Sequence, residues 1–229
     1  MMPSRSTTSS TKGSRRSFLV QFYTALVLSS LLSTVSALHI VMPGGSGPVG
    51  KLLASKLSPA TKVTILSRNK YLASAPNKVT EVFGWVGEGY LRQHPNVQIR
   101  DWDGGDLLDI VGCDWMGWQD DTLAKADIII NLCGGYTEQR IMATERVVRE
   151  SLKVNSNAFQ IVVSPTEEDI SVISPVATDV KLGRVAACED MVTKNCRNSK
   201  CVRIEANRLD QSCDKILQAI QEWEKESQS

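Results

Sequence analysis

The stretch MPGGSGPVG, residues 42–50, spaces three glycines three residues apart, and it decides how the rest of the chain is interpreted. A short apolar run at 38–42 leads straight into it, which is typical of a buried strand. From about residue 47 to 57 apolar residues recur on one helical face, and a second apolar run follows at 62–67. Strand, glycine loop, helix and strand in this order indicate a βαβ unit that binds a dinucleotide at its first turn. The alternative is a plain tight turn without a ligand.

The three evenly spaced glycines of the loop each have a predicted role. Gly44 permits a tight turn with an unusual backbone angle φ, and Gly47 leaves room for a pyrophosphate. Gly50 lets the helix lie close to the sheet. The backbone amides at the start of the helix would then point at the phosphates, supported by the helix dipole. The predicted cofactor-binding residues of this loop are Gly44, Gly45, Ser46, Gly47, Pro48, Val49 and Gly50.

The end of the second strand indicates which dinucleotide is bound. An NAD site requires an acidic residue there, which accepts hydrogen bonds from the adenosine ribose. Here the strand ends in Ser67 and Arg68, and the first acidic residue of the chain is Glu81. A serine hydroxyl and an arginine can bind a 2′-phosphate, and the arginine can also stack on adenine. We therefore expect NADP(H) rather than NAD(H). The alternative for Arg68 is a solvated loop cation.

The remainder of the chain alternates strand and helix patterns. Further strands are expected at 97–100, 127–132, 159–164 and 201–204, further helices at 138–154, 181–194 and 209–226, and one or two short helices within 106–126. Residues 165–179 carry prolines and serines and are expected to form a loop, with the acidic residues 167–169 solvated in it. This order predicts an α/β fold, a Rossmann-type doubly wound parallel sheet of about six strands in the order 3-2-1-4-5-6, with little or no separate substrate lobe.

Residues 1–37 have the pattern of a targeting segment. A basic, acid-free leader with Arg15-Arg16, similar to a twin-arginine signal, precedes a mostly apolar run at 18–32 that is short for a membrane span. Val35 and Ala37 stand at the spacing that a signal peptidase accepts. We expect a cleaved signal for the secretory pathway or an organelle, with a plastid as one option, and no membrane span after cleavage. The binding domain is expected over 38–229, and a retained signal anchor is the alternative.

Composition excludes several classes of function. Residues 38–229 hold 22 basic and 25 acidic side chains, so no basic face is expected for nucleic acid. The six cysteines form no CxxC pair and the two histidines are far apart, so no metal site is expected. Cys196 and Cys201 flank the turn into the last strand and could pair in an oxidising compartment. The sequence indicates no oligomeric state.

Several segments resemble the extended or atypical short-chain dehydrogenase/reductases, in particular their NAD(P)-dependent epimerase-like branch, some members of which are labelled cell-division-inhibitor-like. GGSGPVG is similar to that family's GGTGFIG loop, and Leu66-Ser67-Arg68 to its second-strand ending. Trp102-Asp103 resembles its Trp-containing segment after the third strand, and residues 126–135 resemble its ADaviNLAG stretch. The resemblance is best over 38–165 and implies that the turn at 101–107 flanks adenine. It also implies a nicotinamide-ribose site lined by Asn131, Leu132, Cys133 and Gly134.

The catalytic pair that the resemblance implies is missing. The family places a Tyr-x-x-x-Lys pair near the start of the helix after the fifth strand, where the tyrosine protonates a carbonyl and the lysine lowers its pKa. If AACE at 186–189 aligns with the family's AAxE, those two positions hold Lys181 and Val185. Ser164 matches the hydroxyl at the end of the fifth strand and could pair with Lys181. Tyr136 could serve as a stand-in acid, or be only an aromatic residue at the entry of a helix.

Two functions from different classes therefore stay open. One is an atypical oxidoreductase or epimerase-like enzyme that acts on a small carbonyl or sugar-like substrate. The other is a dinucleotide-binding protein without turnover, acting as a redox sensor or an assembly partner. Family precedent favours the first function, and the missing Tyr/Lys pair favours the second. Both require a bound dinucleotide.

Overall fold

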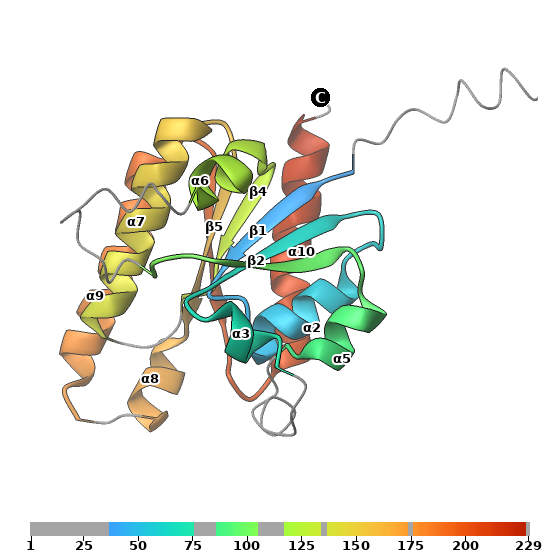
Figure 1. Cartoon of the computed structure of the whole chain (residues 1–229). Coiled ribbons are helices and arrows are strands. Elements are labelled where there is room, and N and C mark those ends of the chain that lie inside the picture. The colour runs from blue at the N-terminus through green and yellow to red at the C-terminus, as the bar shows by residue number, and fades with distance from the viewer. Residues whose placement is uncertain (1–36, 76–85, 105–116, 134–136, 174–175, 228–229) are drawn as a thin grey trace, which may run out of the picture. The chain divides into compact units, whose positions relative to one another are not determined.

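Six apolar segments form one parallel β-sheet in the order β3-β2-β1-β4-β5-β6 (Figure 1). The computed structural model describes residues 37–75, 86–104, 117–133, 137–173 and 176–227. The strands are β1 (His39–Pro43), β2 (Lys62–Ser67), β3 (Val97–Asp101), β4 (Ile128–Asn131), β5 (Phe159–Pro165) and β6 (Ser199–Ile204). The expected fold class and strand order are confirmed. Apart from its last residue, the expected targeting segment 1–37 lies outside the described residues.

The strand β1 lies in the middle of the sheet and is buried along its whole length. Ile40 pairs with Val63 of β2 on one side and with Ile128 of β4 on the other. Neighbouring residues of a strand face opposite sides of the sheet, so Ile40 joins one hydrophobic cluster and Val41 joins another. Each fully buried side chain of this kind stabilises the fold by about 1.5–3 kcal/mol, which is why central parallel strands are apolar on both faces.

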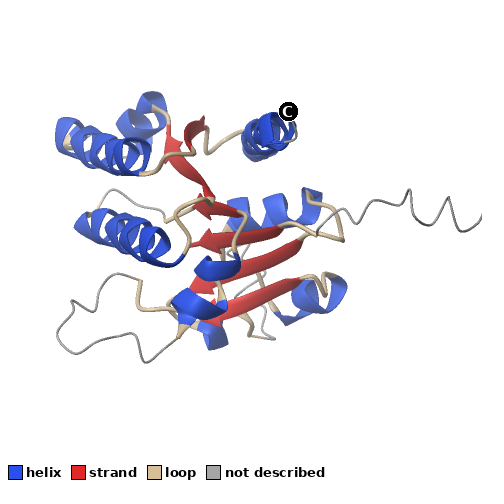
Figure 2. Cartoon of the chain, turned by 90° about the horizontal axis from the view of Figure 1, so that it is seen from above, coloured by secondary structure: helices blue, strands red, loops and turns tan. Residues whose placement is uncertain are grey.

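Helices cover both faces of this sheet (Figures 1 and 2). On one face lie α2 (Pro48–Lys56) and α10 (Leu209–Ser227), which contribute Leu53 and Ile216 to one core cluster. On the other face lie α7 (Glu138–Val154) and α9 (Thr178–Asn195), where Val148 and Val192 belong to a common cluster. Because all strands are parallel, the loops that follow them gather at one edge of the sheet. Ligands of such folds bind at this edge.

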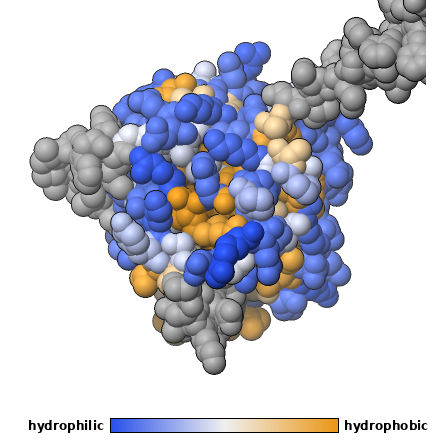
Figure 3. All heavy atoms as spheres, turned by 45° about the vertical axis from the view of Figure 1, so that its right-hand side comes forward, coloured by the Kyte–Doolittle hydropathy of each residue, from blue (hydrophilic) through white to orange (hydrophobic). Residues whose placement is uncertain are grey.

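Short helices lie in the connections between these elements. They are α3 (Lys70–Ala73), α5 (Glu88–Gln93), α6 (Trp118–Asp121) and the 3-10 helix η3 (Leu123–Lys125). The last two agree with the short helices expected within 106–126, although 105–116 lie outside the described residues. On the face drawn in Figure 3, hydrophilic side chains surround an area where apolar side chains gather. Within the described ranges, no helix has the length and apolar character needed to cross a bilayer.

The prediction of a loop over residues 165–179 was wrong, because helix α8 occupies Glu167–Ile173. The hydroxyl of Thr166 accepts a hydrogen bond from the backbone amide of Asp169 at 3.3 Å, as an N-cap residue does. The acidic residues of the first turn favour the positive end of the helix dipole, and Ile170 is fully buried. Asp169 is therefore not simply solvated, since its carboxylate also accepts a hydrogen bond from the Ala206 amide at 2.8 Å. The neighbouring prolines obscured a capping pattern in the sequence.

Candidate functional site

A cavity of about 600 Å³ lies at the carboxyl ends of β1 to β4. This is where the strand order reverses between β1 and β4, the usual ligand site of doubly wound sheets. The strand ends contribute Gly44, Ser67, Arg68, Trp102, Gly104 and Cys133 to its wall. The entry of helix α7 contributes Thr137, Gln139 and Arg140. Of the predicted cofactor-binding residues, Gly44, Ser46, Ser67, Arg68 and Cys133 line this cavity, and the structure adds the wall formed by α7.

The glycine loop is held tightly against the end of β4. Gly44 has a φ of +74°. A Cβ atom added there would lie 2.8 Å from the carbonyl oxygen of Leu132 and 2.9 Å from the Cα atom of Cys133. Only glycine fits such a turn without strain. At Gly50 a Cβ would lie 2.1 Å from the carbonyl oxygen of Gly45, so Gly50 packs against its own turn. The sequence predicted that Gly50 lets the helix lie close to the sheet. The structure shows that the backbone it lies against is that of Gly45, in the turn after β1.

The start of helix α2 is suited to bind an anion. Its N-cap is Gly47, which offers no side-chain hydrogen bond, and Pro48 occupies the first turn, which holds no acidic residue. A Cβ built on Gly47 would meet nothing within 4 Å. Ser46 lines the cavity, whereas the side chain of Val49 packs against the hydrophobic core. The positive end of the helix dipole is thus not neutralised by a side chain from this turn.

The end of β2 carries the predicted phosphate-binding pair. Ser67 is nearly buried, and its hydroxyl oxygen lies 3.3 Å from the Asn69 carbonyl oxygen, to which it donates. Arg68 lies against Gly104, whose φ is +68° and where an added Cβ would come within 2.3 Å of Arg68 Cδ. Asn69 caps α3 by accepting a hydrogen bond from the Leu72 amide at 2.9 Å. The turn after β3 therefore supports the Arg68 side chain at the cavity wall.

Trp102 closes the floor of the cavity at the end of β3. It is 4% exposed and packs edge-to-face on Trp118, with ring centroids 5.5 Å apart. Such aromatic pairs add stability beyond their buried area. The ring thus serves the core as well as the cavity wall. Of the turn expected to flank adenine, residues 105–107 lie outside the described part of the chain.

The residues after β4 divide into structural and cavity-lining ones. Asn131 donates to the Thr144 hydroxyl at 3.1 Å and accepts from the Cys133 amide at 3.0 Å, so it shapes the turn. Leu132 packs against the core, and Cys133 lines the cavity. Burial raises the pKa of the Cys133 thiol to about 12, which keeps it protonated at neutral pH. Gly134 lies outside the described residues.

The predicted catalytic residues are not brought together by the described contacts. Ser164 is 1% exposed, and its hydroxyl accepts a hydrogen bond from Arg140 Nη2 at 3.0 Å. It also contacts Glu189; burial alone would raise the pKa of that carboxyl, but hydrogen bonds from Arg203, Cys201 and Ser164 lower it. Lys181 instead donates to the carbonyl oxygen of Val176.

Tyr136 lies outside the described residues. Cys196 and Cys201, which the sequence suggested could pair, are free thiols in this structure. In the described part of the chain, no three metal-ligating side chains gather at one point.

Sequence reasoning missed Arg140, although it lines the cavity and is 4% exposed. It lies on helix α7 at the spacing of Ala143 and Val147, which are buried in the core beneath. An arginine on the apolar face of an amphipathic helix is a signal that could have identified it, because such a charge is buried only with specific partners.

No family model and no curated protein matches this sequence. Among solved structures, a metagenomic short-chain oxidoreductase (SDR) in complex with NADP aligns with a TM-score of 0.54 and 14% identity, over 82% of this chain and 92% of that chain. UDP-glucuronic acid 4-epimerase from Bacillus cereus in complex with NAD aligns with a TM-score of 0.48 and 15% identity, over 73% of this chain and 57% of that one. The chain spans about half the length of Pen from Bacillus thuringiensis, covering 49% of it. At these identities the likeness is one of fold.

Proposed function

We propose that the protein binds NADP(H) in the cavity at the carboxyl edge of the sheet, as a member of the short-chain dehydrogenase/reductase superfamily. One observation carries the proposal: Gly44 and Ser46 of the glycine turn, which leads into the uncapped start of α2, border one cavity together with Arg68. The turn and the helix start would hold the pyrophosphate through backbone amides. When bound, the nicotinamide would supply hydride transfer.

The charge of the cavity wall supports the phosphorylated cofactor. Among the described lining residues are two arginines, Arg68 and Arg140, and no carboxylate. An NAD site would need a carboxylate at the end of β2 to accept from the ribose hydroxyls. Arg68 would instead bind the 2′-phosphate through charge-assisted hydrogen bonds, with Ser67 beside it. Calorimetric titration tests the proposal: a dissociation constant for NADPH below millimolar supports it, and no binding up to millimolar NADPH overturns it.

A second candidate function is dinucleotide binding without turnover, as a redox sensor or an assembly partner. It is favoured by the position of Ser164, whose buried hydroxyl already contacts Arg140 and Glu189. An enzyme of this fold would use that hydroxyl on a carbonyl or sugar-like substrate. Incubation with NADPH and a panel of carbonyl compounds separates the two. NADPH oxidation that is lost in Ser164→Ala supports the enzyme, and binding without oxidation supports the binder.

We also propose that residues 1–37 are a cleaved address to the secretory pathway or an organelle, and that 38–229 form the binding domain. The apolar run 18–32 followed by Val35 and Ala37 supports this division. Sequencing the N-terminus of the mature protein from its native cells tests it. A start at Leu38 is the expected result, and an intact Met1 contradicts cleavage.

A further inference from the structure

The carboxyl end of β5 is occupied by side chains of the protein itself. Ser164 is 1% exposed, and Arg140 of helix α7 donates from Nη2 to its hydroxyl at 3.0 Å and to the Val163 carbonyl oxygen at 3.1 Å. The same hydroxyl hydrogen-bonds Glu189 of helix α9. A hydroxyl has one proton to donate, and an ionised carboxylate can only accept. The proton of Ser164 is therefore engaged by Glu189, while its oxygen accepts from Arg140.

These contacts continue to the neighbouring strand β6. Arg203 donates from Nε and Nη2 to the two carboxylate oxygens of Glu189 at 3.2 and 2.9 Å. Two parallel bonds between a guanidinium and a carboxylate are among the strong hydrogen bonds of proteins. The backbone is joined at the same place, since the Thr166 amide donates to the Ile204 carbonyl oxygen at 3.1 Å. The end of β5 is thus held from α7, α9 and β6.

Arg140 lies between this end of β5 and the cavity, because it lines the cavity and contacts Ser164. The lining residues that the structure describes come from the ends of β1 to β4, from α3 and from α7. Neither Val163 nor Ser164 is among them. The cavity therefore reaches Arg140, and in the described part of the chain it does not continue onto β5.

The free space lies around Arg68. A second cavity of about 460 Å³ shares Arg68, Thr137 and Gln139 with the first one and adds Met142. In doubly wound folds the end of β2 binds the adenosine ribose, whereas the nicotinamide half lies across the strand-order reversal, towards β4 and β5. The described cavities thus offer room on the adenosine side, and the protein's own side chains fill the end of β5.

We propose that the protein recognises NADP(H) through its 2′-phospho-ADP-ribose part alone, because Arg140 and Ser164 close the place that the nicotinamide ring would take. This rests on the proposed function, since the glycine turn and Arg68 hold that part of the cofactor. The ligand class then includes any compound that contains 2′-phospho-ADP-ribose, whatever replaces the nicotinamide. Of the two candidate functions, the inference favours binding without turnover.

Calorimetry on the full chain tests this with NADPH and with 2′-phospho-ADP-ribose, which lacks only the dihydronicotinamide ring. We expect the two dissociation constants to agree within about threefold, because the ring adds no contact. NADPH that binds roughly tenfold or more tightly than 2′-phospho-ADP-ribose overturns the inference and leaves the proposed function intact. Binding of neither compound up to millimolar concentration overturns both.

The fluorescence of the reduced nicotinamide ring gives an independent measurement. A ring that is enclosed in a site from which water is excluded emits at a shorter wavelength than a ring in water. We expect NADPH bound to the unaltered protein to keep the emission maximum of free NADPH. A shift of the maximum to shorter wavelength on binding would show an enclosed ring and contradict the inference.

Arg140→Ala should open the end of β5, because it removes the guanidinium from Val163 and Ser164. We expect NADPH then to bind roughly tenfold more tightly than 2′-phospho-ADP-ribose. The ratio of the two dissociation constants is the measure, since a lost contact with a phosphate would weaken both ligands equally. Arg92→Ala, which removes an exposed arginine from its pair with Glu88, is the control and should keep the ratio of the unaltered protein.

An unchanged ratio in folded Arg140→Ala contradicts the role of Arg140 in closing the site. Circular dichroism shows whether this variant folds. If it does not fold, the comparison of the two ligands and the emission maximum, both measured on the unaltered protein, decide the matter.

Discussion

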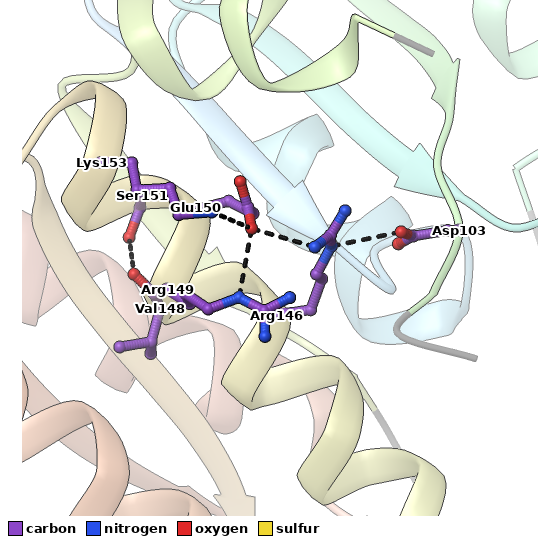
Figure 4. Close-up of polar contacts among 7 residues, drawn as sticks. All are labelled: Asp103, Arg146, Val148, Arg149, Glu150, Ser151 and Lys153. Carbon is purple, nitrogen blue, oxygen red and sulfur yellow. Dashed lines mark hydrogen bonds and ion pairs between the residues drawn. The ribbon is translucent and has the colours of Figure 1, made fainter. Parts of the chain in front are cut away.

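Arg146 Nε lies 3.2 Å from Asp103 Oδ2, and the two side chains are only 5% and 0% exposed (Figure 4). Arg146 Nη1 also contacts Glu150 Oε1 at 3.0 Å, and Lys153 Nζ reaches the same oxygen at 3.1 Å. Asp103 stands between Trp102 and Gly104, which both line the cavity. The ion pair thus joins helix α7 to the turn that supports Arg68.

Removing Arg146 should destabilise the protein. Arg146→Met leaves the Asp103 carboxylate buried without this partner, and breaking a buried pair costs about 3–5 kcal/mol of unfolding free energy. The double variant Arg146→Met/Asp103→Leu should recover part of the loss, because no buried charge is then left alone. Urea denaturation measures both. Lys194→Met, which breaks an exposed pair with Asp190, is the control and should change little. A midpoint for Arg146→Met equal to that of the control would contradict the structural role.

Gly104→Ala should weaken NADPH binding by displacing Arg68. The added Cβ would lie 2.3 Å from Arg68 Cδ, and alanine is strained at a φ of +68°. We expect NADPH affinity to fall by roughly tenfold and stability by about 1–2 kcal/mol. Gly183→Ala, in open space on helix α9, is the matched control and should leave both unchanged or slightly raise stability. Calorimetry measures the NADPH affinity of Gly104→Ala. An unaltered affinity would contradict a role of Arg68 in binding the cofactor.

Gly47→Ala should weaken NADPH binding without lowering the stability of the fold. Because an added Cβ meets nothing within 4 Å and the φ of Gly47 is −83°, the protein should keep its stability to within about 0.5 kcal/mol. The methyl group would stand where the pyrophosphate approaches the start of α2, so NADPH affinity should fall by about tenfold or more. Gly50→Ala should instead lower the stability, because its Cβ would overlap the Gly45 carbonyl oxygen and disrupt the turn. Thermal melts and NADPH titrations of the pair check this, and normal NADPH binding by Gly47→Ala would argue against a phosphate at that turn.

Stability should fall on mild acidification because of His39. Its Nε2 lies 2.9 Å from the Thr64 hydroxyl, and burial lowers its pKa below the ordinary value of 6.5. The unfolded chain then binds the proton more readily than the folded one, so stability decreases as the pH falls through 6.5 towards the lowered pKa. Urea unfolding between pH 7.5 and roughly 5.5 measures this. His39→Gln should flatten the profile in that window, whereas His94→Gln should retain it. An unchanged slope in His39→Gln would assign the pH dependence to other groups.

The sheet and the glycine turn after β1 could be predicted from the sequence, whereas much of the cavity wall could not. Strands such as β4 are apolar on both faces, and the glycine spacing after β1 fits few other structures. Helix α8 was missed because Pro165 precedes Thr166, so the capping pattern was interpreted as a loop. The Asp103–Arg146 pair joins distant parts of the chain, and a charge in a helix is ordinarily assumed to face solvent. Arg140 was missed for the same reason.

The most direct test of the central claim compares NADPH with NADH in calorimetric titrations of the unaltered protein and of Arg68→Glu. The two cofactors differ only in the 2′-phosphate that Arg68 is proposed to bind. We predict submillimolar binding of NADPH by the unaltered protein, at least roughly tenfold weaker binding of NADH, and loss of this difference in Arg68→Glu. Equal affinities for NADPH and NADH in the unaltered protein, or equal losses for both in the variant, would contradict the assignment of this cavity to NADP(H).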